Sequence, residues 1–107
     1  MARRVQSAAL ALLTAALALS AATLAFATQA RFRCDDGTRL TASFSGGAES
    51  PGSVVLRFAG GRMLTLPQVP SADGGRYQAG AAEFWTKGQG ATLTQGGKAT
   101  TCRVHRR

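Results

Sequence analysis

The polar residues between Pro67 and Gly90 are those best suited to chemistry in this chain of 107 residues. They fall in two short pieces, a glycine-containing loop at Ser71–Tyr77 and a strand-like segment at Ala81–Gly88. A hairpin between these pieces would bring their ends side by side. The side chains expected at the shared rim, here called the polar rim, are Asp73, Arg76, Tyr77, Thr86 and Lys87. Charged groups and hydroxyls on one exposed rim are suited to contact with another molecule.

Catalysis is not indicated by the remaining reactive side chains. His105 is the only histidine and lies close to the C-terminal end of the sequence. The carboxylates show no spacing typical of an acid–base pair, and they are Asp35, Asp36, Glu49, Asp73 and Glu83. The sequence also lacks a phosphate-binding glycine motif before a helix and a cluster of metal ligands. We therefore expect no enzyme, no cofactor and no metal site.

Several residues near the rim also have purely structural explanations. Lys87 alone is typical of a solvated turn, and the Tyr77 hydroxyl could simply close one end of a barrel. Trp85 is more often a packing residue of a barrel wall than a binding residue. Since Phe84 precedes it on the same strand, one of the two aromatic side chains should face outward.

The N-terminal part of the sequence predicts an export signal. A short basic head precedes Val5–Ala27, which carries no charge, and Ala25–Ala27 fits a signal peptidase site. We expect residues 1–27 to be a cleaved signal peptide and residues 28–107 to be the mature domain. Cleavage after Ala30 and a membrane-spanning anchor are the alternatives. No cysteine ends the apolar run, so a lipid anchor is not indicated.

A domain of this size needs a covalent or metal staple, because its core is small. Cys34 and Cys102 are the only cysteines and lie near its two ends. In an exported protein they predict a disulfide, which would stabilise the fold by about 4 kcal/mol. A pair of metal-ligating thiolates is the alternative, but no histidine pair accompanies them.

The mature segment predicts an all-β fold. Turn signals such as Asp35–Gly37 and Ala59–Arg62 recur along it, and apolar residues alternate with polar ones between them. The pattern indicates a small antiparallel β-barrel of about seven to eight short strands, since closure hides strand edges. We expect a flexible loop at Ser45–Gly52, a strand end at Pro67 and a short edge strand at Val69–Ser71. The main strands, to which that edge strand would be an addition, are expected near residues 31–34, 39–44, 54–58, 64–66, 76–78, 82–87, 91–94 and 98–104.

Across the mature segment the sequence resembles the MliC-like family, the inhibitors of c-type lysozyme from Gram-negative bacteria. The matching motifs follow one another along the chain: Phe32-x-Cys34 with Asp36-Gly37, Leu64-x-Leu66-Pro67-Gln68, Ser71-x-x-Gly74-x-Arg76-Tyr77, Phe84-Trp85-Thr86-Lys87-Gly88, Ala91-x-Leu93 and Cys102. The resemblance implies a small barrel with one disulfide and a loop that enters the lysozyme cleft. The implied partner is a c-type lysozyme, and the implied location is the periplasm or the exterior.

The resemblance also implies roles for the rim residues. Lys87 would lie between the two catalytic carboxyl groups of the lysozyme, bond the ionised one and lower the pKa of the acid. Ser71 and Thr86 would hydrogen-bond the cleft. Tyr77 would be an aromatic anchor, and Arg76 would brace Asp73 or reach the target. Gly74 and Gly75 would allow a tight loop.

Two features depart from the family pattern. Many members carry a lipid-attachment cysteine, which this sequence lacks, so a soluble exported form is expected. The loop usually has a second serine that contacts the cleft, and Asp73 stands at that position. This extra carboxylate would face two others, so either Arg76 or Lys87 neutralises it, or the target differs, or the affinity is lower.

The charge of the chain supports an alternative function. Removal of Arg3 and Arg4 with the signal lowers the formal net charge from +8 to +6, which favours anionic partners. The alternative is a secreted module without inhibitory activity that binds anionic envelope glycan or lipopolysaccharide. Nucleic acid is not expected, because the aromatic residues are few. Apart from residues 105–107, the charges are scattered along the sequence.

Overall fold

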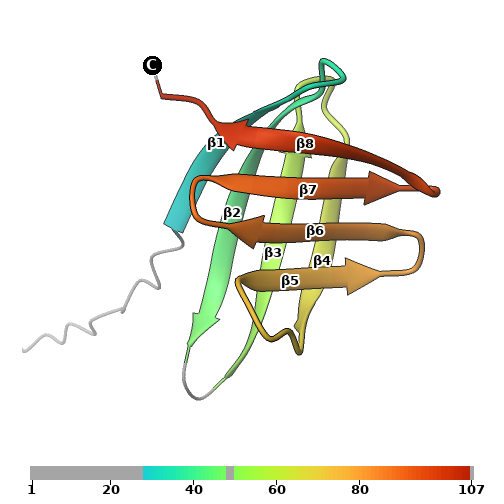
Figure 1. Cartoon of the computed structure of the whole chain (residues 1–107). Helices are drawn as coiled ribbons and strands as arrows, with labels where there is room; N and C mark the ends of the chain where they lie inside the picture. Colours follow the sequence, from blue (N-terminus) through green and yellow to red (C-terminus); the bar gives the residue numbers. More distant parts are fainter. Residues whose placement is uncertain (1–27, 48–49, 107) are drawn as a thin grey trace, which may run out of the picture.

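Alternation of apolar and polar residues folds the chain into a closed barrel of eight antiparallel strands, ordered β1 to β8 (Figure 1). The computed structural model describes residues 28–47 and 50–106, so the predicted signal peptide lies outside the described residues. The strands are β1 Thr28–Cys34, β2 Arg39–Gly47, β3 Ser50–Phe58, β4 Met63–Val69, β5 Gly75–Ala79, β6 Ala82–Lys87, β7 Gly90–Gln95 and β8 Lys98–Val104. The all-β barrel predicted from the sequence is confirmed.

The barrel interior is filled by every second side chain of its strands. The largest side chains that are fully buried are Phe84, Leu56, Leu66, Leu93, Val54 and Cys102. The Phe84 ring meets Phe32 edge-on at 5.2 Å and stacks beside Phe44 at 6.4 Å. On β6, Phe84 points inward between the outward-facing Glu83 and Trp85, as the alternation predicted.

The disulfide lies at the seam where the first and last strands close the barrel. Cys34 on β1 and Cys102 on β8 stand directly opposite each other and are bonded. The predicted pairing is therefore confirmed. The pairing of β1 with β8 closes the sheet, so no strand edge is left free. The disulfide covalently links the first and last strands at this closure.

Three local predictions were wrong, and all concern where strands begin or end. β2 and β3 extend into Ser45–Gly52, where Ser45 pairs with Ser53 and their hydroxyls lie 3.0 Å apart. β4 also continues through Pro67 to Val69, so no separate edge strand begins there. The ladder to β3 ends at Pro67 and the ladder to β5 begins at Gln68. A residue without an N–H is tolerated where a strand changes partner.

The arrangement places different loops at opposite ends of the barrel. In Figure 1 the turns β1–β2 and β3–β4 lie at the top, and the loop between β4 and β5 lies at the bottom. Strands β5–β8 cross in front of β1–β4. Within the described ranges, no helix is long and apolar enough to cross a membrane.

Candidate partner-binding loop

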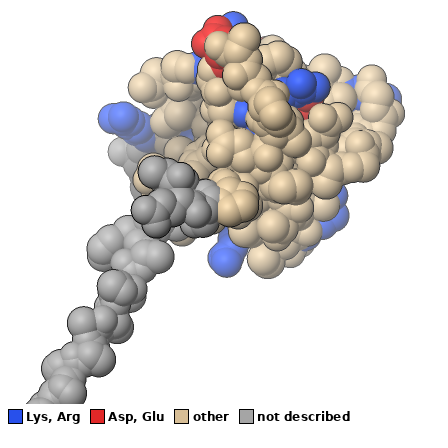
Figure 2. Space-filling model, turned by 90° about the horizontal axis from the view of Figure 1, so that it is seen from below, with Lys and Arg blue, Asp and Glu red and all other residues tan. Residues whose placement is uncertain are grey.

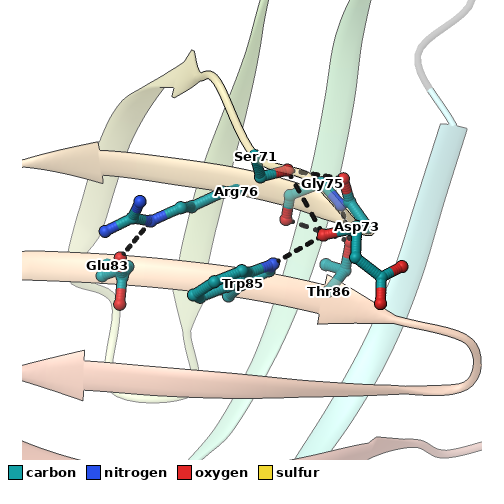
Figure 3. Close-up of polar contacts among 8 residues, drawn as sticks. Ser71, Asp73, Gly75, Arg76, Glu83, Trp85 and Thr86 are labelled. Carbon is teal, nitrogen blue, oxygen red and sulfur yellow. Dashed lines mark hydrogen bonds and ion pairs between the residues drawn. The ribbon is translucent and has the colours of Figure 1, made fainter.

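The loop between β4 and β5, residues 70–74, is fastened to β6 by its own backbone (Figure 3). The indole Nε1 of Trp85 donates a hydrogen bond of 2.9 Å to the carbonyl oxygen of Asp73. The Ser71 hydroxyl donates within the loop, to the carbonyl oxygen of Gly74 at 3.0 Å. These bonds satisfy two loop carbonyls and hold the loop in one shape.

Gly74 is the point at which the loop touches β6 most closely. Its φ of +70° lies in the left-handed region, which side chains with a β-carbon avoid. A β-carbon at this position would overlap the carbonyl oxygen of Thr86. Next to it, the Thr86 hydroxyl accepts from Gly75 N and donates to Gly75 O, each at 3.3 Å. The close approach therefore requires glycine at position 74.

Arg76 braces the outer wall of the barrel next to the loop. Its Nε lies 2.6 Å from Glu83 Oε2, and its guanidinium stacks 4.8 Å from the Trp85 ring centroid. Figure 3 shows these three side chains side by side on β5 and β6. The prediction that Arg76 braces Asp73 is wrong, because the Arg76 head is paired with Glu83. Arg76 instead contacts Trp85, the residue that bonds the loop.

Lys87 is the cation that accompanies Asp73. Lys87 Nζ lies 3.2 Å from Asp73 Oδ2, and the two side chains are 64% and 66% exposed. An ion pair this exposed contributes about 1 kcal/mol or less, because water and salt screen it. Both groups can exchange their partner for a new one at small cost. Asp73 is thus neutralised locally by Lys87, one of the two cations considered for it.

Tyr77 lies elsewhere than expected. Its side chain is part of the core, the residue is only 8% exposed, and its ring lies 5.7 Å from that of Phe44. Burial raises the pKa of the Tyr77 hydroxyl. The prediction that Tyr77 lies on the polar rim is wrong, because Tyr77 stands opposite the inward-facing Phe84 in the β5–β6 ladder. A buried ring cannot serve as an aromatic anchor for a partner.

The polar rim therefore divides into exposed and supporting residues. Ser71, Asp73 and Lys87 are exposed at the tip. Arg76 and Thr86 are half-buried, and their polar atoms bond within the protein. Trp85 was considered only as a packing residue, yet it holds the loop through its N–H. The available signal was its strand position, facing outward two residues before Lys87. In residues 28–47 and 50–106, no group of three or more His, Cys, Asp or Glu is placed to hold a metal.

Comparison with known proteins gives the family of this barrel. The family model described as "Membrane-bound lysozyme-inhibitor of c-type lysozyme" matches residues 32–101. The chain belongs to this MliC family. The matched region runs from the first core phenylalanine on β1 to the residue before Cys102, and includes both the loop and β6.

A curated relative and a solved structure agree with this assignment. The "Membrane-bound lysozyme inhibitor of C-type lysozyme" of Cupriavidus necator is 36% identical over 63 residues. This match covers 59% of the chain and 49% of the relative, so it spans about half the length of that protein. The structure of Pseudomonas aeruginosa MliC in complex with hen egg white lysozyme is 25% identical, with a TM-score of 0.65. It covers 89% of this chain and 99% of that one.

Proposed function

We propose that this MliC family member inhibits a c-type lysozyme by inserting the β4–β5 loop and Lys87 into the active-site cleft. Family membership supports this function, as does the similarity to a Pseudomonas MliC that was solved with hen egg white lysozyme. The family name implies an envelope location. We propose that the mature chain, residues 28–107, acts as a soluble protein of the periplasm or outside the cell.

The main support for this mechanism is that the loop backbone is fixed by hydrogen bonds while the charged side chains at its tip are exposed. The loop is fixed by bonds from Trp85, Ser71 and Thr86, while Asp73 and Lys87 remain exposed. A loop that is already ordered loses less conformational entropy on binding, which increases affinity. Ser71 and Thr86 thus contribute mainly by shaping the loop.

Lys87 supplies the inhibitory charge. A c-type lysozyme requires one protonated carboxylic acid and one carboxylate. An ammonium placed between them would bond the carboxylate and lower the pKa of the acid, since positive charge favours the ionised form. The acid would then lack the proton that it must give to the leaving group. Physical blockage of the cleft by the loop adds to this effect.

Asp73 modifies this arrangement relative to the usual serine. Its carboxylate would enter a cleft that already holds two others, and like charges repel. The Lys87 ammonium next to it offsets that repulsion, and its exposure lets it contact a second carboxylate. We expect binding to be weaker than with serine at position 73, but not lost.

The net positive charge should slow association with a basic lysozyme. The chain has a formal charge of +8, or +6 without Arg3 and Arg4. Long-range repulsion lowers the association rate and is screened by salt. The contact patch itself can still be complementary to the cleft.

The test is the lysis of bacterial cell walls by hen egg white lysozyme, titrated with the purified oxidised protein. We expect saturable inhibition with an endpoint near one inhibitor per lysozyme, and a matching stoichiometry in calorimetry. Absence of both binding and inhibition, with the disulfide formed and the barrel folded, would contradict the proposal. Binding without inhibition would contradict insertion into the cleft.

Replacing Trp85 with phenylalanine tests whether loop order contributes to affinity. A smaller aromatic ring that can still stack with Arg76 remains, but the bond to the Asp73 carbonyl is lost. Such a bond is worth about 1 kcal/mol, so we expect the Kd for hen egg white lysozyme to rise about fivefold. Calorimetry measures this change, and an unaltered Kd would show that the indole N–H does not order the bound loop.

A further inference from the structure

The outer face of β8, β1, β2 and β3 gathers arginines that are far apart in the sequence. Arg33 on β1 stands opposite Arg39 on β2 and Arg103 on β8, which makes a row of three. In the adjacent row, Arg31 and Arg57 flank Thr41. Neighbouring rows on one face are about 7 Å apart along a strand. The face therefore carries a dense array of guanidinium groups.

Four of these side chains line a hollow of about 470 Å³, here called the arginine groove: Arg31, Arg33, Arg39 and Arg57. His105 lies at its edge, and its Nε2 accepts a hydrogen bond of 3.4 Å from Arg33 Nη2. Phe32 and Leu40 also line the groove, but their side chains are buried in the core. They can contribute only backbone to the groove floor. Thr41, Phe58 and Ala59 complete the lining, so the groove combines four guanidinium groups with an apolar patch.

In the described residues, few acidic side chains lie close enough to neutralise the positive charge of the arginine groove. None of the three ion pairs found in residues 28–47 and 50–106 includes a groove arginine. Asp35 lies 3.8 Å from Arg103. Asp36 accepts the Thr38 N–H at 2.9 Å, which lowers the pKa of its carboxyl. Like charges directly opposite in a sheet are destabilising, so a bound anion would relieve repulsion within the row.

The groove is separate from the inhibitory loop. It lies beside the turns β1–β2 and β3–β4, at the end of the barrel opposite the β4–β5 loop (Figure 1). Figure 2 views the molecule from below, the loop end, and there acidic surface is limited to small areas while basic side chains project around the outline. A ligand in the groove and a lysozyme at the loop would not compete for the same residues.

The guanidinium groups and the size of the groove favour a compact ligand that carries phosphate groups. Guanidinium groups bind phosphate through two parallel hydrogen bonds, and several of them favour a ligand with several phosphates. The volume falls within the range of small-molecule sites. Phe58 is half-exposed in the groove but packs against the core, and Phe32 is buried, so the described part of this face offers no series of rings on which nucleic-acid bases could stack.

We propose that the arginine groove binds a saccharide carrying two or more phosphate groups, the chemistry of the lipopolysaccharide headgroup. Such binding would hold the protein at a phosphorylated envelope surface while the loop stays free. The proposal does not depend on inhibition of lysozyme, because it concerns other residues.

The test compares two double variants of equal charge by titration with purified rough-type lipopolysaccharide. Arg39→Gln with Arg57→Gln removes half of the groove arginines. Arg62→Gln with Lys98→Gln removes two exposed cations that do not line the groove. We expect the groove variant to lose binding by about tenfold or more and the control to change by about twofold at most. Circular dichroism and thermal unfolding establish that both variants are folded.

Titrations of the wild-type protein with other ligands test which chemical group is recognised. Chemically dephosphorylated lipopolysaccharide should bind the wild-type protein at least about tenfold more weakly. Vesicles of phosphatidylglycerol and a single-stranded DNA oligonucleotide should also bind more weakly than lipopolysaccharide. Equal losses in the two double variants would mean attraction by net charge alone and would overturn the proposal. DNA or phosphatidylglycerol binding as tight as that of lipopolysaccharide would overturn it as well.

Discussion

Replacing Lys87 with alanine is expected to weaken inhibition of hen egg white lysozyme about 100-fold. In the proposed complex its ammonium bonds the cleft carboxylate where water is excluded, and removing one member of such a pair costs about 2–5 kcal/mol. The loss leaves Asp73 without its partner at 3.2 Å, so that an uncompensated carboxylate enters an acidic cleft. The inhibition constant in a cell-wall lysis assay measures the effect.

Two further variants separate the possible causes of that loss. Lys98→Ala removes an equally charged, exposed lysine from the start of β8 and should leave inhibition unchanged. Lys87→Ala combined with Asp73→Ser also removes the Asp73 carboxylate, which Lys87→Ala alone leaves without its ion-pair partner. If Lys87 served only to neutralise Asp73, the double variant would recover full inhibition. We expect partial recovery, and wild-type potency in Lys87→Ala itself would remove this lysine from the mechanism.

The barrel was predictable because its core obeys the period of a strand. Leu56, Leu66, Phe84 and Leu93 each fall in an alternating segment, and each is fully buried. The pattern fails where residues are small or lack a hydrogen-bond donor. Ser45 and its neighbours offer no apolar alternation, although their backbone still pairs. Pro67 was predicted to end a strand because it lacks an N–H donor. It is accommodated because β4 changes its ladder partner there, and that change depends on tertiary contacts.

The candidate site was predictable in its position and less so in its internal contacts. The loop and β6 do lie together, and Lys87 is exposed beside Asp73. Tyr77 was misplaced because the sequence of so short a strand does not show which side chains face the core. Its pairing with the inward-facing Phe84 decides this. Thr86 was expected to reach a partner, but its hydroxyl bonds the backbone of Gly75. The spacing of residues in the sequence does not show which backbone carbonyls of the loop will accept a hydrogen bond from a side chain.

The gathering of arginines on this outer face could not be seen in the sequence, for a topological reason. Arg33 and Arg103 are far apart along the chain, and the closure of β1 on β8 makes them direct neighbours. Arg39 joins the row through the β1–β2 ladder. Charge that is scattered in the sequence is thus gathered on one face by strand register, so linear charge patterning underestimates the surface potential of a small barrel.

Replacing Gly74 with alanine should strongly weaken inhibition while the barrel remains folded. The residue has a φ of +70°, and a β-carbon would overlap the Thr86 carbonyl oxygen, which belongs to the backbone and cannot turn away. The loop must therefore leave β6, and the Trp85 bond to Asp73 would be lost with it. We expect the inhibition constant to rise at least about 30-fold, a loss of roughly 2 kcal/mol of binding free energy.

Gly80 provides the matched control for this substitution. It lies in the turn between β5 and β6 with a φ of +58°, and a β-carbon there would meet no atom within 4 Å. Alanine at either position carries the same conformational cost of about 1 kcal/mol, but only position 74 adds the overlap with β6. Gly80→Ala should thus be slightly less stable in thermal unfolding and fully inhibitory. If Gly74→Ala inhibited as well as Gly80→Ala, the close contact between loop and β6 would not be what shapes the inhibitory tip.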